Sequence, residues 1–393
     1  MARILLVSHE LSVTGAPNSL LRQAKYFLDD GHEVSVWTYR GGDLAARYAE
    51  AGLTPETVAD DRNAILGKYR ENPVRYDLVI CNTIRTYRCV DVLLRQGLKV
   101  AWFVRETRLL DEDYWMNPDF AKVFRSAGNL YAVSEYAADV VRFYNRRVRV
   151  VHNAVADSFR GFAAPADAVR FGFIGSLIPE KGIDLLVEAF RKVHRDFPAI
   201  TLSVAGGIPS DALTRFRGET AGEDSIRWLG TVQQAEKAAF FGSIDVLCVP
   251  SLDEPFGLTV AEGAMHGKAI ITTDRTGANF LVGPGNGRIV PAGDAAALAA
   301  ALADFAVMDA GALHTCEENS RAAYVAKATP DAERTAVLRL LDETTLEPPP
   351  RGRLPDDRRQ PLFHETRYMD GRRVFYLKNL RLMTLKGKGV RRR

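Results

Sequence analysis

Short apolar runs alternate with amphipathic stretches along the first 150 residues of the chain. Residues 4–7 are Ile, Leu, Leu and Val, a run that predicts a buried strand. The stretch after them, up to about residue 30, carries apolar side chains at helical spacing, and Gly31 is suited to end that helix. Further strands are predicted at residues 34–37, 78–81, 100–104, 130–133 and 148–152. Strands that alternate with helices indicate a parallel sheet with helical crossovers.

The same alternation restarts after residue 168. Residues 156–168 have weak periodicity and are rich in Ala, with Pro and Asp, which predicts a linker. Beyond it, strands are predicted at residues 171–175, 202–205, 226–229, 246–249 and 269–272, and helices at 181–195, 233–241, 258–266 and about 295–305. We therefore predict an α/β fold with doubly wound domains at residues 1–155 and 169–345. A ligand is expected in the cleft at the carboxyl ends of the strands.

Composition narrows the class of protein. A chain of 393 residues suits two full-sized domains, and a content of 47% hydrophobic residues excludes a mostly disordered chain. No run of about 18 apolar residues is present, and the N-terminus turns polar at Ser8 and His9, too early for a signal peptide. A cytoplasmic protein is therefore expected. The four cysteines are scattered without the spacing of a zinc or redox motif, so we expect them to be reduced.

Charge is distributed unevenly. Residues 351–393 contain 14 Lys/Arg and 4 Asp/Glu and carry +10, whereas the whole chain is +3, so the rest is acidic. Within this tail, residues 374–393 mix large apolar side chains with bases, which is typical of a helix at the surface of an anionic membrane. The alternative is that the apolar residues pack onto the first domain and leave a flexible basic end. Nucleic acid is not expected as a partner, because the acidic body offers no basic groove.

Candidate chemistry is concentrated at residues 250–262, Pro-Ser-Leu-Asp-Glu-Pro-Phe-Gly-Leu-Thr-Val-Ala-Glu, which follow a strand and open a helix. Gly257 lets the backbone approach a ligand closely, and the free amides at the start of the helix suit a phosphate. Glu254 precedes the helix and Glu262 lies on it, so one carboxylate can meet a polar ligand end while the other binds a hydroxyl pair. The alternative is a helix cap with two solvated glutamates.

This segment resembles the Glu-x7-Glu signature of the retaining nucleotide-sugar glycosyltransferases of family 4, which have the GT-B fold. Four other segments match the family in order: Val-His-Asn-Ala-Val at 151–155, Gly-Ser-Leu-Ile-Pro-Glu-Lys-Gly at 175–182, Trp-Leu-Gly at 228–230, and Gly-Arg-Ile-Val-Pro-Ala-Gly-Asp at 287–294. The resemblance covers roughly residues 1–345. It implies two Rossmann-like domains facing a central cleft, the first on the acceptor side and the second holding the nucleotide sugar.

The resemblance also implies roles for individual residues. Glu254 would contact the donor sugar, Glu262 the ribose hydroxyls and Lys181 the diphosphate. The other donor-binding residues it implies are Gly15, Ser176, Phe256, Gly257, Leu258 and Thr259. A lysine at the start of a helix is unfavourable, because the N-terminal end of the helix dipole is positive. This cost favours a functional reason for Lys181. The implied mechanism retains the anomeric configuration and positions groups for a leaving phosphate that takes the acceptor's proton.

No metal or other cofactor is expected, because Lys181 and the helix amides can neutralise the diphosphate. Asp111-Glu112-Asp113 mimics a metal-binding Asp-x-Asp, but it does not follow a strand and is interpreted as an exposed loop.

Two positions depart from the family. Ser176 stands where many relatives carry a phosphate-binding arginine, so either the phosphate site is weaker or another base serves. Arg105 stands where many carry a histidine, and it stays charged and cannot transfer a proton. Arg105 is expected either to bind an anionic group near the acceptor or to replace the arginine missing at 176. The alternative is a surface pair of Arg105 with Glu106. His9 either faces the cleft or caps a loop.

The expected function is transfer of a sugar, from a UDP-sugar in the first instance, to a glycan or lipid-linked precursor of a cell-surface polysaccharide. If the tail binds lipid, the enzyme would work at the inner face of the plasma membrane. A sugar-nucleotide epimerase of the same fold and a non-catalytic donor-binding subunit are the alternatives.

Overall fold

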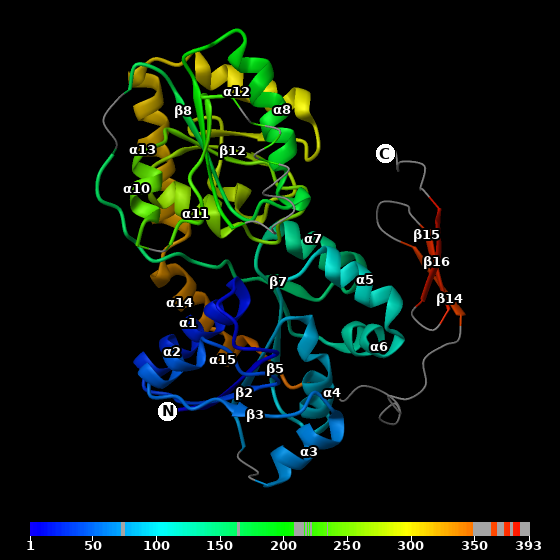
Figure 1. Cartoon of the computed structure of the whole chain (residues 1–393). Coiled ribbons are helices and arrows are strands. Elements are labelled where there is room, and N and C mark those ends of the chain that lie inside the picture. The colour runs from blue at the N-terminus through cyan, green and yellow to red at the C-terminus, as the bar shows by residue number, and fades with distance from the viewer. Residues whose placement is uncertain are drawn as a thin grey trace. The chain divides into compact units, whose positions relative to one another are not determined.

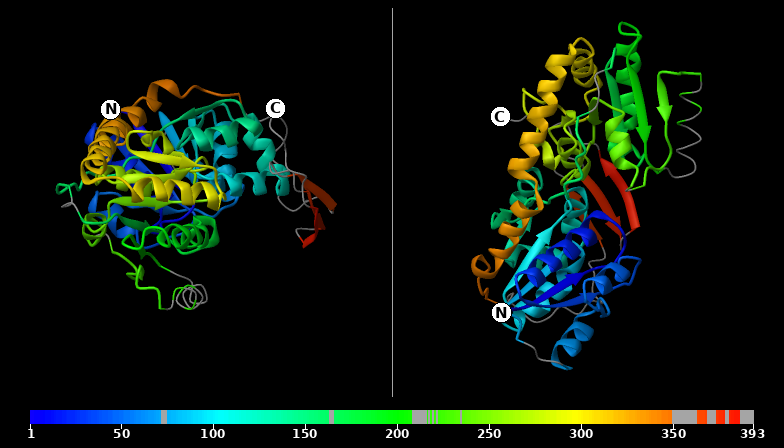
Figure 2. Two further views of the ribbon diagram at one scale, coloured as in Figure 1. Left: turned by 90° about the horizontal axis from the view of Figure 1, so that it is seen from above. Right: turned by 90° about the vertical axis from the view of Figure 1, so that its left-hand side faces the viewer.

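The chain divides into two compact α/β units in the computed structural model (Figure 1). The first unit consists of Met1–Val151 together with the chain from Arg334 onward, and the second is His152–Glu333. The structure describes residues 1–71, 75–162, 166–207, 216, 218, 220, 222–233 and 235–348, and the backbone of three later strands at 363–367, 373–377 and 380–385. Each unit has helices on both faces of a parallel sheet (Figures 1 and 2).

The sheet of the first unit has seven parallel strands in the order β3-β2-β1-β4-β5-β6-β7. They are β1 (Arg3–Ser8), β2 (Glu33–Thr38), β3 (Glu56–Thr57), β4 (Leu78–Asn82), β5 (Val100–Val104), β6 (Leu130–Ala132) and β7 (Val148–Val150). The helices are α1 (Gly15–Asp29), α2 (Ala45–Glu50), α3 (Arg62–Glu71), α4 (Tyr87–Arg95), α5 (Arg108–Met116), α6 (Pro118–Ser126) and α7 (Glu135–Tyr144). The strand order reverses between β1 and β4, which is where ligands bind in such sheets.

The core of the first unit explains why the chain returns to it. Ile4 and Leu6 of β1 pack with Leu20 and Phe27 of α1, which confirms the apolar stripe predicted for this helix. The same cluster contains two buried residues from the far end of the chain, Val337 of α14 (Pro330–Leu338) and Leu340 of α15 (Leu340–Glu343). The expected second domain at 169–345 therefore ends too late, because the chain from Arg334 onward belongs to the first unit. These last helices bury their apolar side chains against the first sheet, a pairing that local sequence does not encode.

The sheet of the second unit has six parallel strands in the order β10-β9-β8-β11-β12-β13. They are β8 (Arg170–Ile174), β9 (Thr201–Ala205), β10 (Ile226–Trp228), β11 (Val246–Val249), β12 (Ala269–Thr273) and β13 (Gly287–Val290). Helices α8 (Ile183–His194) and α12 (Ala295–Ala306) pack together on one face, and α11 (Leu258–Met265) packs with α13 (Ala310–Lys327) on the other. This sheet reverses between β8 and β11. The four cysteines of the chain are buried and free, as expected.

The tail differs from its prediction. Instead of a helix over 374–393, the structure has three antiparallel strands, β14 (Phe363–Arg367), β15 (Arg373–Leu377) and β16 (Leu380–Leu385). Val, Phe, Tyr and Thr favour strands, and that preference outweighs the composition that indicated a membrane helix. The basic residues 386–393 lie outside the described part of the chain. Among the described helices, none alone has the length and apolar character to cross a membrane, and one bent pair, Ala295–Ala306 with Ala310–Glu343, passes only in combination.

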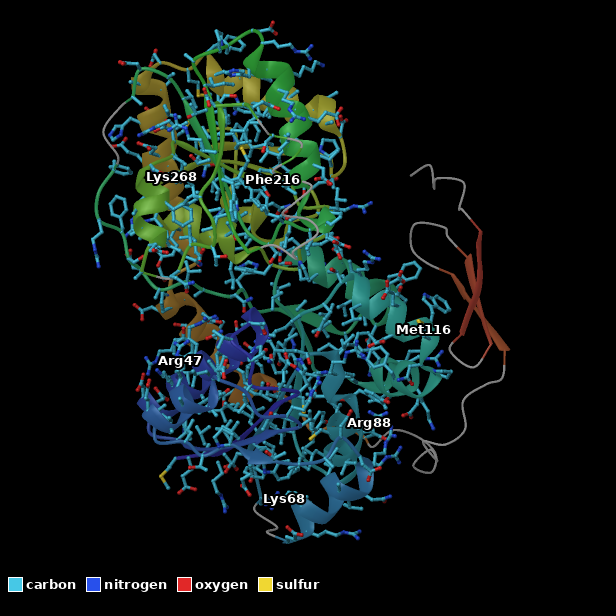
Figure 3. The ribbon with its side chains drawn as sticks, in the orientation of Figure 1. Arg47, Lys68, Arg88, Met116, Phe216 and Lys268 are labelled. Carbon is cyan, nitrogen blue, oxygen red and sulfur yellow. The ribbon has the colours of Figure 1, made fainter. Side chains whose placement is uncertain are left out.

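A buried ion pair lies under the second sheet. Lys268, labelled in Figure 3, is 1% exposed and donates to Glu317 Oε1 at 3.2 Å and to the carbonyl oxygen of Ile244 at 3.1 Å. Glu317 comes from α13 and is also buried, so the pair joins this helix to the start of β12. Both side chains are largely shielded from water, so each charge depends mainly on the other for compensation.

Glu317→Ala should lower the free energy of unfolding by about 3–5 kcal/mol, because it leaves the Lys268 ammonium buried and uncompensated. The double variant Lys268→Met/Glu317→Leu should regain most of this loss, since it removes both charges. Urea denaturation measures both, with Asp304→Ala, which breaks the exposed Arg288–Asp304 pair, as a control expected to change stability by less than about 1 kcal/mol. Equal losses in the single and double variants would contradict this account.

Candidate functional site

Two loops meet where the second sheet reverses its strand order. One follows β8 and the other follows β11, and the backbone N–H of Leu252 donates to the carbonyl oxygen of Glu180 at 2.9 Å. Gly182 has φ +72°, and a Cβ at this position would lie 2.1 Å from the carbonyl oxygen of Pro250. Only glycine permits this approach. The glycine therefore brings the Lys181 loop against the loop that carries Glu254.

Lys181 and Glu254 form an ion pair, in which the ammonium donates to Glu254 Oε2. Lys181 ends a short 3-10 turn (Pro179–Lys181) just before α8, rather than lying in the helix as predicted. The backbone fixes Glu254, because its N–H donates to the carbonyl oxygen of Arg275 at 2.9 Å and its carbonyl accepts from Gly277 at 2.9 Å. The structure thus brings together two of the three residues predicted to act in catalysis.

The N-terminus of α11 adjoins this pair. Gly257 is its N-cap with φ +90°, and no side chain caps the first amides. A Cβ on Gly257 would come within 2.8 Å of Thr276 Cγ2, so the turn requires glycine. Leu258 and Thr259 are half-buried. The Phe256 side chain is buried, so Phe256 could contact a ligand only through its main chain. This arrangement can bind an anion through unpaired helix amides.

A second lysine, which the sequence analysis missed, holds the second carboxylate. Lys237, the first residue of α10 (Lys237–Gly242), donates to Glu262 Oε1 at 2.6 Å. The two residues are 25 positions apart in different helices, so no local pattern predicts their contact. Both predicted carboxylates are therefore neutralised by lysine, which excludes the alternative of two solvated glutamates. Ser176 lies exposed in the same loop as Lys181.

In the first unit, the Arg105 side chain is buried and contacts neighbouring residues of the sheet. The residue is 8% exposed, and its guanidinium lies 5.1 Å from the centre of the Phe103 ring and donates from Nε to Asn82 Oδ1. Asn82 donates in turn to the carbonyl oxygen of Ala16 at 3.0 Å, which ties the loop of Gly15 to the sheet. Arg105 therefore holds the ends of β4 and β5 together, and the alternative of a surface pair with Glu106 is wrong. Gly15 itself lies exposed at the first position of α1.

A cavity of about 480 Å³ lies at the carboxyl edge of the first sheet. Its lining residues come from the segments after β1, β2, β3, β4 and β5 and are mostly polar: His9, Tyr39, Arg40, Asp60, Arg85, Glu106 and Leu109. Burial lowers the pKa of His9. Burial raises the pKa of Glu106 to about 7, against the opposing effect of the backbone N–H groups of Arg105 and Ile84 that its carboxylate accepts. A carboxyl group that titrates near neutral pH in a cavity is a candidate functional group.

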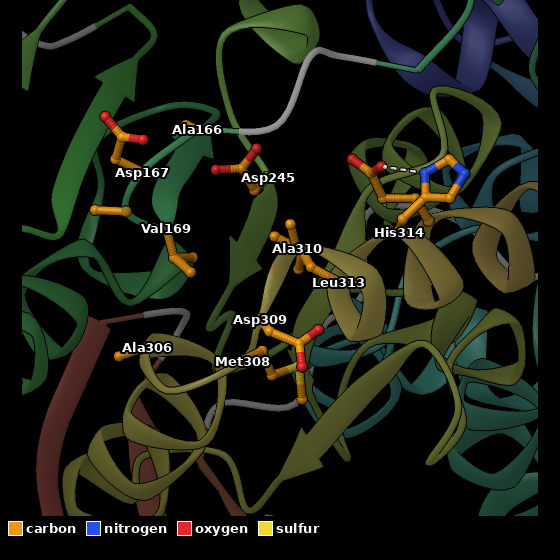
Figure 4. Close-up of a pocket in the computed structure, with 12 residues that line it drawn as sticks. Ala166, Asp167, Val169, Asp245, Ala306, Met308, Asp309, Ala310, Leu313 and His314 are labelled. Carbon is orange, nitrogen blue, oxygen red and sulfur yellow. Dashed lines mark hydrogen bonds and ion pairs between the residues drawn. The ribbon is translucent and has the colours of Figure 1, made fainter.

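Another cavity, of about 370 Å³, lies at the amino edge of the second sheet (Figure 4). Val169 and Asp245, which line it, directly precede β8 and β11. His314 and Glu317 of α13, whose side chains lie 3.4 Å apart, also line it. Because it opens at the opposite edge of the sheet from Gly257, it is separate from the lysine–carboxylate cluster.

The Asp111-Glu112-Asp113 segment lies in α5, not in an exposed loop, and that prediction is wrong. Asp111 is 8% exposed and accepts from the Tyr144 hydroxyl, while Asp113 pairs with Arg85 at 3.0 Å. Within α5, Leu110 and Asp111 are the buried residues. Within the described ranges, no group of three or more His, Cys, Asp or Glu side chains is arranged to hold a metal ion.

Two family models match the chain. The model of glycosyl-transferase family 4 matches residues 1–142, and the model of glycosyl transferases group 1 matches residues 168–306. The first match falls in the first unit and the second in the second unit. Together they include both loop clusters described above.

Curated relatives match in part. A phosphatidyl-myo-inositol mannosyltransferase of Mycolicibacterium smegmatis is 34% identical over 158 residues, which are 40% of this chain and 38% of the relative. A D-inositol 3-phosphate glycosyltransferase of Streptomyces scabiei is 31% identical over 211 residues, 47% of each chain. The chain thus spans less than half the length of these relatives.

Solved structures match in fold. HepE of Anabaena, in complex with UDP, superimposes with a TM-score of 0.74 over 86% of this chain and 99% of its own, at 18% identity. The likeness confirms the predicted GT-B fold, with two Rossmann-like units of parallel strands.

Glu106→Gln should change how stability depends on pH. The raised pKa of Glu106 means that its contribution to stability is complete below its ordinary pKa near 4.5 and is lost as pH rises through 7. Glutamine keeps an oxygen that accepts the two amides but does not titrate. The variant should therefore gain about 2–3 kcal/mol relative to the native chain between pH 4.5 and 7.5. Urea denaturation at several pH values measures this difference, and a constant difference over that range would refute the shifted carboxyl.

Proposed function

We propose, from the premise that this chain belongs to glycosyltransferase family 4, that it transfers a sugar from a UDP-sugar to a hydroxyl group of a glycan or lipid-linked acceptor. The observation that carries the proposal is the Lys181–Glu254 pair beside the uncapped N-terminus of α11. A lysine, a carboxylate and free helix amides in one cluster supply what this transfer needs. They can stabilise the leaving diphosphate and accept hydrogen bonds from sugar hydroxyls.

In the proposed reaction, the residues of the second unit have separate roles. The amides of Leu258 and Thr259 and the Lys181 ammonium would neutralise the diphosphate as its bond to the sugar breaks. Glu254, held by its backbone, would keep the sugar hydroxyls in place. Glu262, held by Lys237, would accept the two ribose hydroxyls, since a carboxylate can take both hydrogen bonds at once.

Retention of the anomeric configuration belongs to the same proposal. A leaving phosphate oxygen that takes the acceptor's proton delivers the acceptor to the face it has left, so the protein needs no nucleophilic carboxylate. The charge stabilisation then falls to Lys181 and the helix amides, and we propose that the reaction needs no metal ion and no other cofactor. Turnover that persists in excess EDTA is the corresponding test.

The support for donor and acceptor comes from relatives. UDP is bound in the HepE structure, which favours a UDP-sugar. The mycobacterial relative is named for transfer to phosphatidyl-myo-inositol, which favours an acceptor carried on a lipid in cell-surface glycan synthesis. A lipid-linked acceptor would place the enzyme at the inner face of the membrane, with the basic tail from 374 to 393 against anionic lipid. Release of a free nucleotide and a 2-epimer from donor alone would favour an epimerase instead.

Lys181→Ala should lower turnover about a hundredfold, the effect of losing one strong charge stabiliser of the leaving group. The measurement is the rate of UDP release with acceptor present. Lys192→Ala, on the exposed face of α8, is the matched control and should leave the rate unchanged. Equal rates for Lys181→Ala and the control would remove Lys181 from the mechanism.

Glu262→Ala should weaken nucleotide binding about tenfold or more, because a ribose diol would lose both its hydrogen bonds. A thermal-shift panel of UDP-, GDP- and ADP-sugars without added metal measures it. A nearly saturating ligand should stabilise the native chain by about 2–3 kcal/mol. Glu188→Ala, an exposed position on α8, is the control. A native chain that responds to no donor would count against transfer altogether and favour a subunit that has lost the activity.

A further inference from the structure

A buried threonine hydroxyl links two loops beside Glu254. Thr273, the last residue of β12, is 1% exposed. Its hydroxyl donates to the carbonyl oxygen of Ser251 at 2.7 Å and accepts from the backbone N–H of Arg275 at 3.3 Å. Ser251 belongs to the loop after β11, whereas Arg275 belongs to the loop after β12. One side chain therefore joins the two loops at the carboxyl edge of the second sheet.

The hydrogen-bonding capacity of this hydroxyl is used completely. Thr276 Oγ1 lies 3.1 Å from Thr273 Oγ1, and Thr276 is fully buried. A hydroxyl has one proton to donate and two lone pairs that accept. Because the proton of Thr273 goes to Ser251, the Thr276 hydroxyl is the donor in the contact between the two threonines. Thr273 thus donates one hydrogen bond and accepts two, which a valine of similar size cannot do.

These bonds hold both ends of the segment from Ser251 to Glu254. Thr273 binds the carbonyl oxygen of Ser251 directly at the start of the segment. At its end, the N–H of Glu254 donates at 2.9 Å to the carbonyl oxygen of Arg275, whose own N–H donates to Thr273. The carbonyl oxygen of Glu254 accepts from the N–H of Gly277, also at 2.9 Å. The backbone that carries the Glu254 carboxylate is therefore held through the Thr273 hydroxyl.

Thr276 extends this network to the start of α11. Its backbone forms a parallel bridge with Glu254. Its methyl carbon Cγ2 faces the N-cap glycine so closely that a Cβ on Gly257 would lie 2.8 Å away. The hydroxyl of Thr276 is bound to Thr273 while its methyl group packs against Gly257, so both branches of the side chain are used. The same pair of threonines thus contacts the segment of the carboxylate and the N-terminus of the helix.

We propose that Thr273, with Thr276 as its partner, is a positioning residue of the sugar-transfer site, and that its hydroxyl sets where Glu254 meets the donor sugar. The inference rests on the proposed function for the role of Glu254 and adds the side chain that fixes this carboxylate. Both threonines are 1% exposed or less, so they act through the loop and not on the donor. Without the Thr273 hydroxyl, the Ser251 carbonyl and the Arg275 N–H would lose this partner, and the loop would shift to satisfy them.

The neighbouring Thr272 provides a matched control. It is also fully buried, and its hydroxyl donates to the carbonyl oxygen of Val249 at 3.2 Å. Val249 is the last residue of β11, so this bond joins two strands and does not hold the loop that carries Glu254. Thr272→Val and Thr273→Val each remove a buried hydroxyl, and both should lower Tm. Their effects on the site should differ.

The first measurement is amide hydrogen exchange, followed by NMR in the full-length chain without ligand. In Thr273→Val, the amides of Glu254 and Gly277 should exchange about tenfold faster than in the native chain, because the segment opens locally. In Thr272→Val, both rates should stay at the native value. Thr273→Ser keeps the hydroxyl and should restore the native rates, which a role in packing alone would not predict.

The second measurement compares the affinities for free UDP and for the tightest-binding of UDP-glucose, UDP-galactose and UDP-N-acetylglucosamine by calorimetry. Thr273→Val should bind the UDP-sugar about tenfold more weakly, because the sugar loses its hydrogen bonds to Glu254. Its affinity for free UDP should be unchanged, since the nucleotide does not contact Glu254 in the proposed site. Thr272→Val and Thr273→Ser should bind both ligands as the native chain does.

Two results would overturn the proposal. One is exchange of the Glu254 and Gly277 amides that is no faster in Thr273→Val than in Thr272→Val. The other is a UDP-sugar affinity that is equal in these two variants or that Thr273→Ser does not restore. A native chain that binds neither UDP nor any of the three UDP-sugars would contradict the proposed sugar transfer itself. The exchange rates need no ligand, so they would still decide whether Thr273 holds Glu254.

Discussion

The contact between Gly182 and the carbonyl oxygen of Pro250 is the constraint on which the second-unit site depends. It brings two loops at the sheet's reversal point closer than any side chain would allow. With the backbones in contact, Lys181 can reach Glu254. The backbone of Glu254 is fixed in turn, because it donates to the carbonyl oxygen of Arg275 and accepts from the N–H of Gly277. The chemistry of the cluster therefore follows from a backbone requirement. A side chain at position 182 would separate the lysine from the carboxylate before it altered any charge.

The two sites use charge differently. In the second unit, each carboxylate already has a lysine partner, so a donor diphosphate must compete with Glu254 for Lys181. Both ion pairs are partly exposed, and such pairs contribute little to stability, so breaking them costs little. The lysine is thus held in place when the site is empty and is released easily to a stronger anion. In the first unit, the paired cations are arginines rather than lysines: Arg40 lies beside Glu10 and Arg85 beside Asp113, at the edge of a cavity.

Much of the second-unit site could be predicted from the sequence, because it is built from local signals. The glycines at 182 and 257, Lys181 and the Glu254–Glu262 spacing all lie in two short segments after strands. Lys237 could not be predicted, since its role comes from a contact with Glu262, which lies 25 positions further along the chain in another helix. The contact of Arg105 could not be predicted for the same reason: its guanidinium donates to Asn82 at the end of β4, a residue 23 positions earlier in the chain.

The return of α14 and α15 to the first unit also has a physical cause that local pattern cannot express. Val337 and Leu340 lie in helices whose periodicity is compatible with either sheet. The choice between the two sheets depends on the apolar surface of α1 and the neighbouring strands, which Val337 and Leu340 cover. That surface exists only once the first unit has folded. Because Val337 and Leu340 belong to the first core, that core depends on a segment that follows the whole second unit in the chain. Truncation before residue 334 would therefore expose the first core, even though it removes nothing from either candidate site.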